Sequence, residues 1–245
     1  MNKTERLTQL FGKRIAQGDF APGVALPSEA ELCEQFGVSR NVIREVVKVL
    51  STKRLIDAKR NRGLFVMPTE RWNYLDADVL EWALENGSHP TLIRSLIEVR
   101  GLIEPTISRW AAERATAVDL VDIEASVNTM AANPSRLDVF HEADIRFHRA
   151  VLVASHNMVM QQLSDAVSAL QRAIFDVTFV REAAHMALTI QEHHDLFEAI
   201  RRKLPDLAEA ASRRMIERTA RRAFSGIDRD DGKIGTLSPT TELDS

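Results

Sequence analysis

Three side chains that can bind a metal ion recur at spacings that place them in a helical interior. Asp144 and His148 are four residues apart, so they share one face of a helix, one turn from each other. The same face carries the apolar residues of that segment, which are Leu137, Phe140, Phe147, Val151 and Leu152. His193 falls in a second apolar stripe, with Ile190, Phe197, Ile200 and Leu204. All three polar groups are therefore predicted to point inward.

Buried groups of this kind need a partner. An unpaired buried carboxylate costs on the order of 3 kcal/mol or more. One carboxylate and two imidazoles suit a divalent transition metal, with Zn as the first choice, so Asp144, His148 and His193 are predicted metal ligands. The same spacing also fits an Asp–His hydrogen bond beside a satisfied core histidine, and spacing alone does not separate the two.

An anionic ligand near these groups would need a cation. Arg100 can engage a carboxylate at two points, although a surface salt bridge with Glu98 or Glu104 is equally compatible with its position. The residues predicted to bind such a ligand are Arg100, the three groups above, Phe179, Thr189 and Arg222.

These groups require helices to position them, and residues 76–224 carry helical periodicity almost throughout. Helices are predicted at 76–86, 90–115, 117–132, 135–155, 158–182, 187–203 and 206–224, with Pro105 kinking the second. They indicate an all-α antiparallel bundle. Residues 225–245 are polar and aperiodic, which predicts a disordered tail.

The N-terminal part has a different design. A first helix is predicted over residues 4–17. Ser28 and Glu31 form a capping box for a second, which ends at Gly37, and Ser39 caps a third. Two short strands follow around a basic turn. This order predicts a winged helix-turn-helix domain over residues 1–68, with a linker at 69–75, and a mainly α protein as a whole.

Positive charge gathers in this domain. Between Arg40 and Arg62 the chain has eight Lys or Arg against two acidic residues, a net charge of +6, whereas the whole chain carries −3. Such a concentration on a third helix and a wing predicts contact with DNA phosphates. The predicted DNA-binding set is Ser28, Ser39, Arg40, Asn41, Arg44, Arg60, Arg62 and Gly63.

Composition is that of an ordinary globular protein, with 44% hydrophobic and 27% charged residues in 245. The single cysteine, Cys33, cannot form an intramolecular disulfide, and no signal peptide or run of 18 apolar residues is evident. A cytoplasmic protein without a membrane segment is expected.

The segments PSEAEL, GVSRNVIRE and RNRGLFV resemble the DNA-binding domain of the GntR family of bacterial transcription regulators. The resemblance implies that Arg40 and Arg44 reach bases or phosphates in the major groove, with help from Ser39 and Asn41, and that Gly63 enters the minor groove. This chain has Ala30 where many members have Arg, which removes one DNA contact.

Residues 92–222 resemble the FCD effector domain of the FadR subfamily, through EVRGLIEP, the spacing of Asp144 and His148, and EHHDLFEAI. The resemblance implies a bound metal that helps to hold a carboxylate effector. This chain lacks the subfamily's last His ligand and offers only Met215, Glu217 and Arg218 nearby. Three protein ligands, a substitution by Glu217, or no metal at all remain open.

The runs LCEQFGVSRNVIREV, RWNYLDADVLEW and EADIRFHRAVL are similar to the galactonate-responsive repressors of that subfamily. They imply a homodimer that leaves a pseudo-palindromic operator when it binds an aldonic acid. A regulator that senses metal alone and a metal-dependent enzyme are the alternatives; the chain is predicted not to be an enzyme, because no additional general base is recognisable.

Overall fold

The computed structural model describes residues 2–59, 63–85, 90–163, 167–168, 172 and 183–234. The chain divides into two compact units, residues 1–89 with 163–173 and residues 90–162 with 174–245. None of the helices in the described part of the chain is long and apolar enough to cross a membrane.

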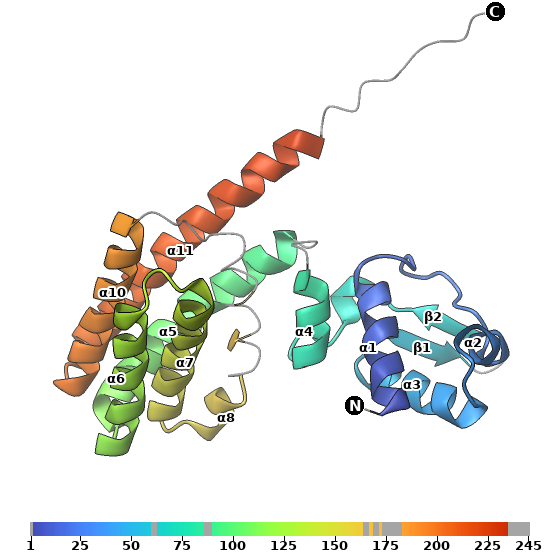
Figure 1. The fold of residues 1–245 in the computed structure, drawn as a ribbon, viewed down its shortest axis with the longest axis horizontal. Coiled ribbons are helices and arrows are strands. Elements are labelled where there is room, and N and C mark those ends of the chain that lie inside the picture. Colours follow the sequence, from blue (N-terminus) through green and yellow to red (C-terminus); the bar gives the residue numbers. More distant parts are fainter. Residues whose placement is uncertain are drawn as a thin grey trace, which may run out of the picture. The chain divides into compact units, whose positions relative to one another are not determined.

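The first unit is a winged helix-turn-helix, as predicted (Figure 1). Its elements are α1 (Lys3–Ala16), α2 (Glu29–Phe36), α3 (Arg40–Thr52), β1 (Ile56–Lys59), β2 (Gly63–Val66), the 3₁₀ turn η1 (Thr69–Arg71) and α4 (Ala77–Leu84). The strands form an antiparallel hairpin in which Ile56 faces Val66 and Lys59 faces Gly63.

Local capping explains the bounds of α2. The backbone N–H of Glu31 donates to Ser28 Oγ, and the Glu31 carboxylate accepts from the Ser28 backbone N–H, so the predicted capping box is present. Gly37 ends the helix with φ 60°, a left-handed conformation that glycine adopts without strain. Ser39 occupies the N-cap position of α3, but its side chain makes no capping hydrogen bond.

Helix α4 packs against α1, whereas the helical periodicity of residues 76–86 predicted a helix of the bundle that follows. Trp82 is 1% exposed and belongs to the same core as Phe11 and Leu50. A Cβ at Gly12 would lie only 2.3 Å from the Trp82 ring. Because glycine has no side chain, the indole ring of Trp82 can pack directly on α1. Lys53, the C-cap residue of α3, places its Nζ 2.6 Å from Oδ1 of Asp76, the N-cap residue of α4. Sequence periodicity cannot reveal contacts between residues so far apart.

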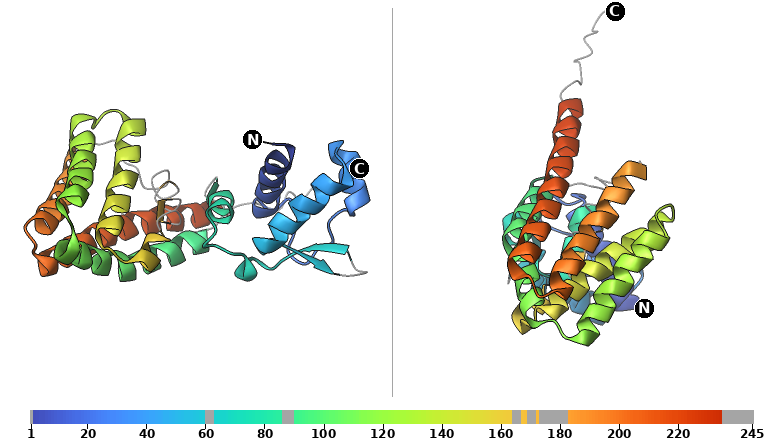
Figure 2. Two further views of the ribbon diagram at one scale, coloured as in Figure 1. Left: turned by 90° about the horizontal axis from the view of Figure 1, so that it is seen from below. Right: turned by 90° about the vertical axis from the view of Figure 1, so that its left-hand side faces the viewer.

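The second unit is an all-α bundle of α5 (Pro90–Arg114), α6 (Ala117–Ala132), α7 (Leu137–Ala154), α8 (Met158–Gln161), α10 (Ala183–Arg201) and α11 (Pro205–Ile234). Figures 1 and 2 show α6 beside α7 and α10 beside α11, each pair joined by a short connection. The long α5 packs on both α7 and α11. These helices bring α5, α7 and α10 together around the predicted polar groups.

Two helices differ most from the predicted bounds, and α10 begins at Ala183, four residues before the predicted start at 187. The helix expected at 158–182 ends at Gln161, because Gln162 and Leu163 form a turn, and much of the remainder lies outside the described residues. Helix α11 continues through Ile234, into the segment expected to be disordered. Extending a helix that already exists costs far less than starting one, which offsets the weak propensity of this segment. Pro105 lies buried inside α5, which remains one helix.

Candidate functional site

Asp144, His148 and His193 converge as predicted. The first two come from α7 and the third from α10, and one ligand atom from each lies within 4.8 Å of the others. His193 Nε2 is 2.8 Å from Asp144 Oδ1, and His148 Nε2 is 3.9 Å from the same oxygen. His193 is only 2% exposed. The structure therefore assembles one carboxylate and two imidazoles in the interior of the bundle.

The orientation of His193 leaves a lone pair facing this carboxylate. Its Nδ1 lies 2.7 Å from the backbone carbonyl oxygen of Thr189. Because a carbonyl only accepts, Nδ1 carries the proton, and Nε2 of the neutral ring has none. Nε2 is buried and lacks hydrogen-bond geometry to any partner in the described residues, despite its short distance to Asp144. Two facing lone pairs are favourable only with a cation between them or with the imidazole protonated.

His148 is held in a similar way by Glu104, a residue of α5. Its Nδ1 lies 3.2 Å from Glu104 Oε2, so the ring donates there and turns Nε2 toward Asp144. Glu104 in turn accepts two hydrogen bonds from Arg100, one of them 3.3 Å from Nη2 to Oε2. A histidine that binds a metal through one ring nitrogen usually donates a hydrogen bond from the other to a carboxylate or a carbonyl.

The electrostatics of the cluster keep both carboxylates ionised. Burial opposes the charge on Asp144, but a positive charge at His193, together with those of His148 and Arg100, outweighs the effect of burial and lowers the pKa of Asp144. Burial likewise opposes ionisation of Glu104, and Arg100 and His148 overcome it, lowering the pKa of Glu104 to about 2. The donor set fits a divalent transition metal because it offers one anionic oxygen and two imidazole nitrogens with their protons directed away.

The position of the missing histidine supplies no further ligand. Glu217 is exposed and does not belong to the cluster, so the idea that it substitutes for the absent ligand is not supported. Met215 is buried against the core. Arg218, by contrast, reaches back to α10, where its Nη2 lies 3.1 Å from Thr189 Oγ1 and also contacts Glu192.

The predicted effector-binding residues have different surroundings. Arg100 is buried and paired with Glu104, rather than forming the surface salt bridge that its position also allowed. Thr189 connects His193, through its carbonyl, with Arg218, through its hydroxyl. Arg222 is partly buried one turn after Arg218, and burial together with Arg218 lowers its pKa. Phe179 lies outside the described residues.

Sequence reasoning named Glu104 as a possible partner of Arg100 but missed its contact with His148, and it missed the pairing of Glu192 with Arg218. The signal available for Glu104 was its spacing of four residues from Arg100 on one helix. Glu192 and Arg218 lie on different helices, so no spacing rule connects them.

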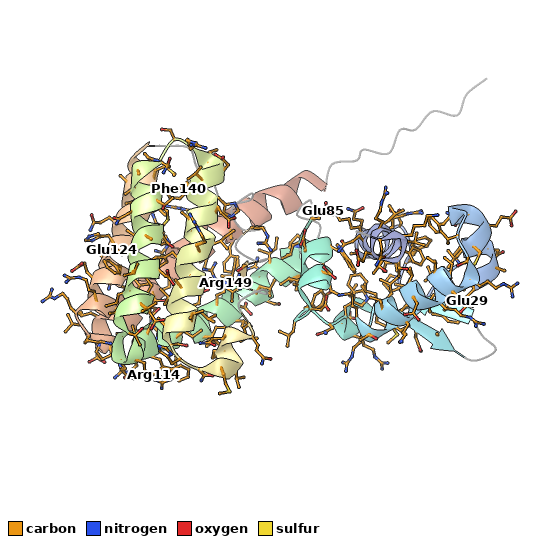
Figure 3. All side chains as sticks on the ribbon, turned by 60° about the horizontal axis from the view of Figure 1, so that its bottom comes forward. Glu29, Glu85, Arg114, Glu124, Phe140 and Arg149 are labelled. Carbon is orange, nitrogen blue, oxygen red and sulfur yellow. The ribbon has the colours of Figure 1, made fainter. Side chains whose placement is uncertain are left out.

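The predicted DNA-reading surface is exposed on α3. Ser39, Arg40, Asn41 and Arg44 are all exposed at or near the N-terminal end of this helix, and its other face packs through Ile43 and Leu50. Arg44 is 67% exposed and approaches Glu29 of α2, labelled in Figure 3, at 3.3 Å. The hydroxyl of Ser28 is engaged with Glu31. Gly63 starts β2 with φ 91°, and Arg60 and Arg62 lie outside the described residues.

Comparison with known families gives two matches. Residues 3–66 match the model described as bacterial regulatory proteins of the gntR family, and residues 95–218 match the FCD domain. FCD domains can bind metal, which agrees with the cluster above.

Individual relatives point the same way. The chain is 54% identical to the galactonate operon transcriptional repressor of Escherichia coli K12 over 222 residues, covering 91% of this chain and 97% of that protein. It is 26% identical to the Uxu operon regulator of Haemophilus influenzae, over 94% of this chain and 86% of that protein. These relatives are transcription regulators, so the enzyme alternative falls away.

Solved structures agree in fold. A GntR protein of Streptococcus agalactiae is 25% identical with a TM-score of 0.51, covering 89% of this chain and 97% of that one. Lar, described as controlling the expression of the Listeria monocytogenes agr system, has a TM-score of 0.65 at 16% identity and covers 92% of this chain and 98% of that one. The second match bears on the fold alone.

Proposed function

The chain belongs to the GntR family of bacterial transcription regulators and carries an FCD domain, and from this premise we propose that it represses genes of sugar-acid catabolism. A small carboxylate of the galactonate type releases it from its operator. The 54% identity to a galactonate operon repressor over most of both chains supports this choice of effector class.

The DNA-binding half of the proposal rests on α3. Arg40 and Arg44 enter the major groove, Ser39 and Asn41 contact the DNA beside them, and the hairpin tip with Arg60, Arg62 and Gly63 reaches the minor groove. Exposed cations on a helix whose opposite face packs into the core have the arrangement that groove docking requires. Ser28 supports the surface from the start of α2.

The effector half rests on the convergence of Asp144, His148 and His193. His193 Nε2, buried 2.8 Å from Asp144 Oδ1, is the observation that most directly supports a cation there. Zn fits the donor set best. A bound cation would supply a positive centre for the oxygen atoms of a hydroxy acid. Thr189, Phe179, Arg222 and Arg100 complete the proposed effector site, with Arg100 acting through Glu104 on the orientation of His148.

Regulation follows if two copies act together. A homodimer places two α3 helices on the halves of a pseudo-palindrome, and an effector that prefers a different spacing of those helices lowers operator affinity. The shift can be no larger than the effector's preference for one state over the other. Such a regulator works in the cytoplasm, where its operator lies.

The test is an operator-binding assay with the DNA upstream of the chain's own gene. Fluorescence anisotropy is followed while galactonate, gluconate and galacturonate are added, with and without Zn. We expect galactonate to release the DNA at concentrations where the others do not. Release by Zn alone would instead favour a sensor of metal without an organic ligand. If every acid leaves operator affinity unchanged under both conditions, the proposed effector class is wrong.

A further inference from the structure

A second polar cluster adjoins the metal-binding groups and is incompletely satisfied. Arg218 of α11 contacts Glu192 of α10, and the side chains are 14% and 19% exposed. Arg218 Nε and Nη1 are buried without a hydrogen-bond partner among the described residues, whereas Glu192 Oε2 lies against Arg218 Nη2 in the ion pair. Buried polar atoms in native proteins are nearly always paired, so two unpaired N–H groups of one buried arginine indicate a missing hydrogen-bond acceptor.

The position of this pair connects it with the metal cluster. Arg218 Nη2 lies 3.1 Å from the hydroxyl oxygen of Thr189, and the carbonyl of the same Thr189 accepts from His193. Glu192 precedes His193 in the chain. The two clusters therefore share one turn of α10.

The chemistry of the pair specifies the missing partner. Arg218 still has N–H groups to donate, and a guanidinium binds carboxylate oxygens particularly well. Glu192 is ionised when paired with Arg218 and can only accept, so its partner must donate. A ligand that carries a carboxylate and a neighbouring hydroxyl satisfies both at once. Arg100 is less suited to the same task, because Glu104 already holds it by two hydrogen bonds.

We propose that Arg218 binds the effector's carboxylate and that Glu192 accepts a hydrogen bond from one of its hydroxyls. This subsite rests on the proposed function, and it assigns the acid end of the effector to α11 and its hydroxylated part to the side of α10. Without effector, Glu192 forms an ion pair with Arg218. Binding therefore exchanges a contact between α10 and α11 for contacts with the ligand.

The test compares three variants of the full chain loaded with Zn. Arg218→Gln removes the charge that binds the carboxylate. Glu192→Gln keeps an accepting oxygen but removes the anion that competes for Arg218. Arg213→Gln changes an exposed arginine of the same helix, one that pairs with Glu209, and is the matched control. Titration calorimetry measures the affinity for galactonate and for galactitol, which lacks the carboxylate.

We expect Arg218→Gln to weaken galactonate binding about 10- to 100-fold, as loss of a hydrogen bond between charged groups does. Galactitol binding should change little. Glu192→Gln should bind galactonate as tightly as the unmodified protein or a few times more tightly. Zn binding and operator affinity should persist in all three variants.

A purely structural ion pair behaves differently. In that case Arg218→Gln and Glu192→Gln would weaken galactonate binding equally, and this result overturns the proposal. Unchanged binding by Arg218→Gln overturns it as well. If Arg218→Gln fails to fold, Glu192→Gln decides the question. A tenfold loss of galactonate affinity in Glu192→Gln is incompatible with Glu192 competing with the ligand for Arg218. Failure of the unmodified chain to bind galactonate would instead overturn the proposed effector class, and this subsite with it.

Discussion

The reading surface on α3 and the polar interior of the helical bundle carry charge in opposite ways. Arg44 is 67% exposed, and its Nε lies 3.3 Å from the carboxylate of Glu29. In the bundle, Arg100 and Glu104 are 7% and 8% exposed and lie against each other. One region presents its charges to solvent, whereas the other pairs them inside the protein.

The difference teaches what each task requires. DNA is a polyanion that neutralises a cationic surface when it binds, so the protein need not pair those cations beforehand. A buried charge loses its hydration when the chain folds and must find its partner within the fold. Substitutions on α3 should therefore change binding and leave stability intact, while substitutions in the bundle interior should change stability first.

The largest effect is expected from Glu104→Ala. Removing this carboxylate leaves the buried Arg100 without its hydrogen-bonded counter-charge and with only Asp144 as an anion nearby, and breaking such a buried pair typically costs about 3–5 kcal/mol of unfolding free energy. Glu98→Ala, an exposed position on the same helix, is the control and should stay within about 0.5 kcal/mol. Urea denaturation followed by circular dichroism measures both. Equal effects would mean that burial does not separate the two regions.

A smaller effect is expected from the metal. Zn at one hundred times its dissociation constant should stabilise the chain by about 2.7 kcal/mol, visible as a higher Tm. His193→Ala should abolish this gain, whereas His194→Ala, its exposed neighbour, should retain it. A Zn-dependent rise in Tm that survives in His193→Ala would place the metal elsewhere.

On the reading surface, Arg44→Ala should weaken operator binding by about 1–3 kcal/mol and reduce the salt dependence of binding by about one phosphate contact. Galactonate affinity and Tm should not change. Arg202→Ala, an exposed charge of the helical bundle, controls for net charge. Gel-shift titrations at several salt concentrations make the comparison, and equal loss in both variants would contradict docking through α3.

The smallest expected effects concern two serines at helix starts. Ser28 bonds with Glu31, so Ser28→Ala should cost about 1 kcal/mol of stability. Ser39 makes no capping bond, so Ser39→Ala should stay within about 0.5 kcal/mol and act mainly on operator affinity. Thermal unfolding and anisotropy, measured on both variants, separate stability from binding. A larger stability loss for Ser39→Ala would show a cap that the structure lacks.

Features set by neighbouring residues could be predicted from sequence. The capping box at Ser28, the left-handed Gly37 and the shared face of Asp144 and His148 each depend on residues within one or two turns. The convergence of His193 was also within reach, because its apolar stripe placed it inward. These local rules supplied the helices of the winged domain and the candidate metal ligands.

Features set by packing between distant segments could not. The partner of His148 on α5 lies 44 residues earlier, and Arg218 meets Glu192 across two helices. Which polar groups pair depends on how α5, α7, α10 and α11 are rotated, and apolar periodicity fixes only the side that faces inward. For the same reason, the packing of Trp82 against Gly12 could not be predicted from the sequence.

That packing of Trp82 determines how the chain can be dissected. A fragment that stops at Val66, where the hairpin ends, would lack the indole ring of Trp82 that packs on α1 and the Asp76 carboxylate that pairs with Lys53. A fragment that runs through Glu85 keeps both contacts and also the pairing of Lys13 with Glu85. The smallest fragment that folds by itself and binds DNA should therefore extend beyond the β1–β2 hairpin to the end of α4.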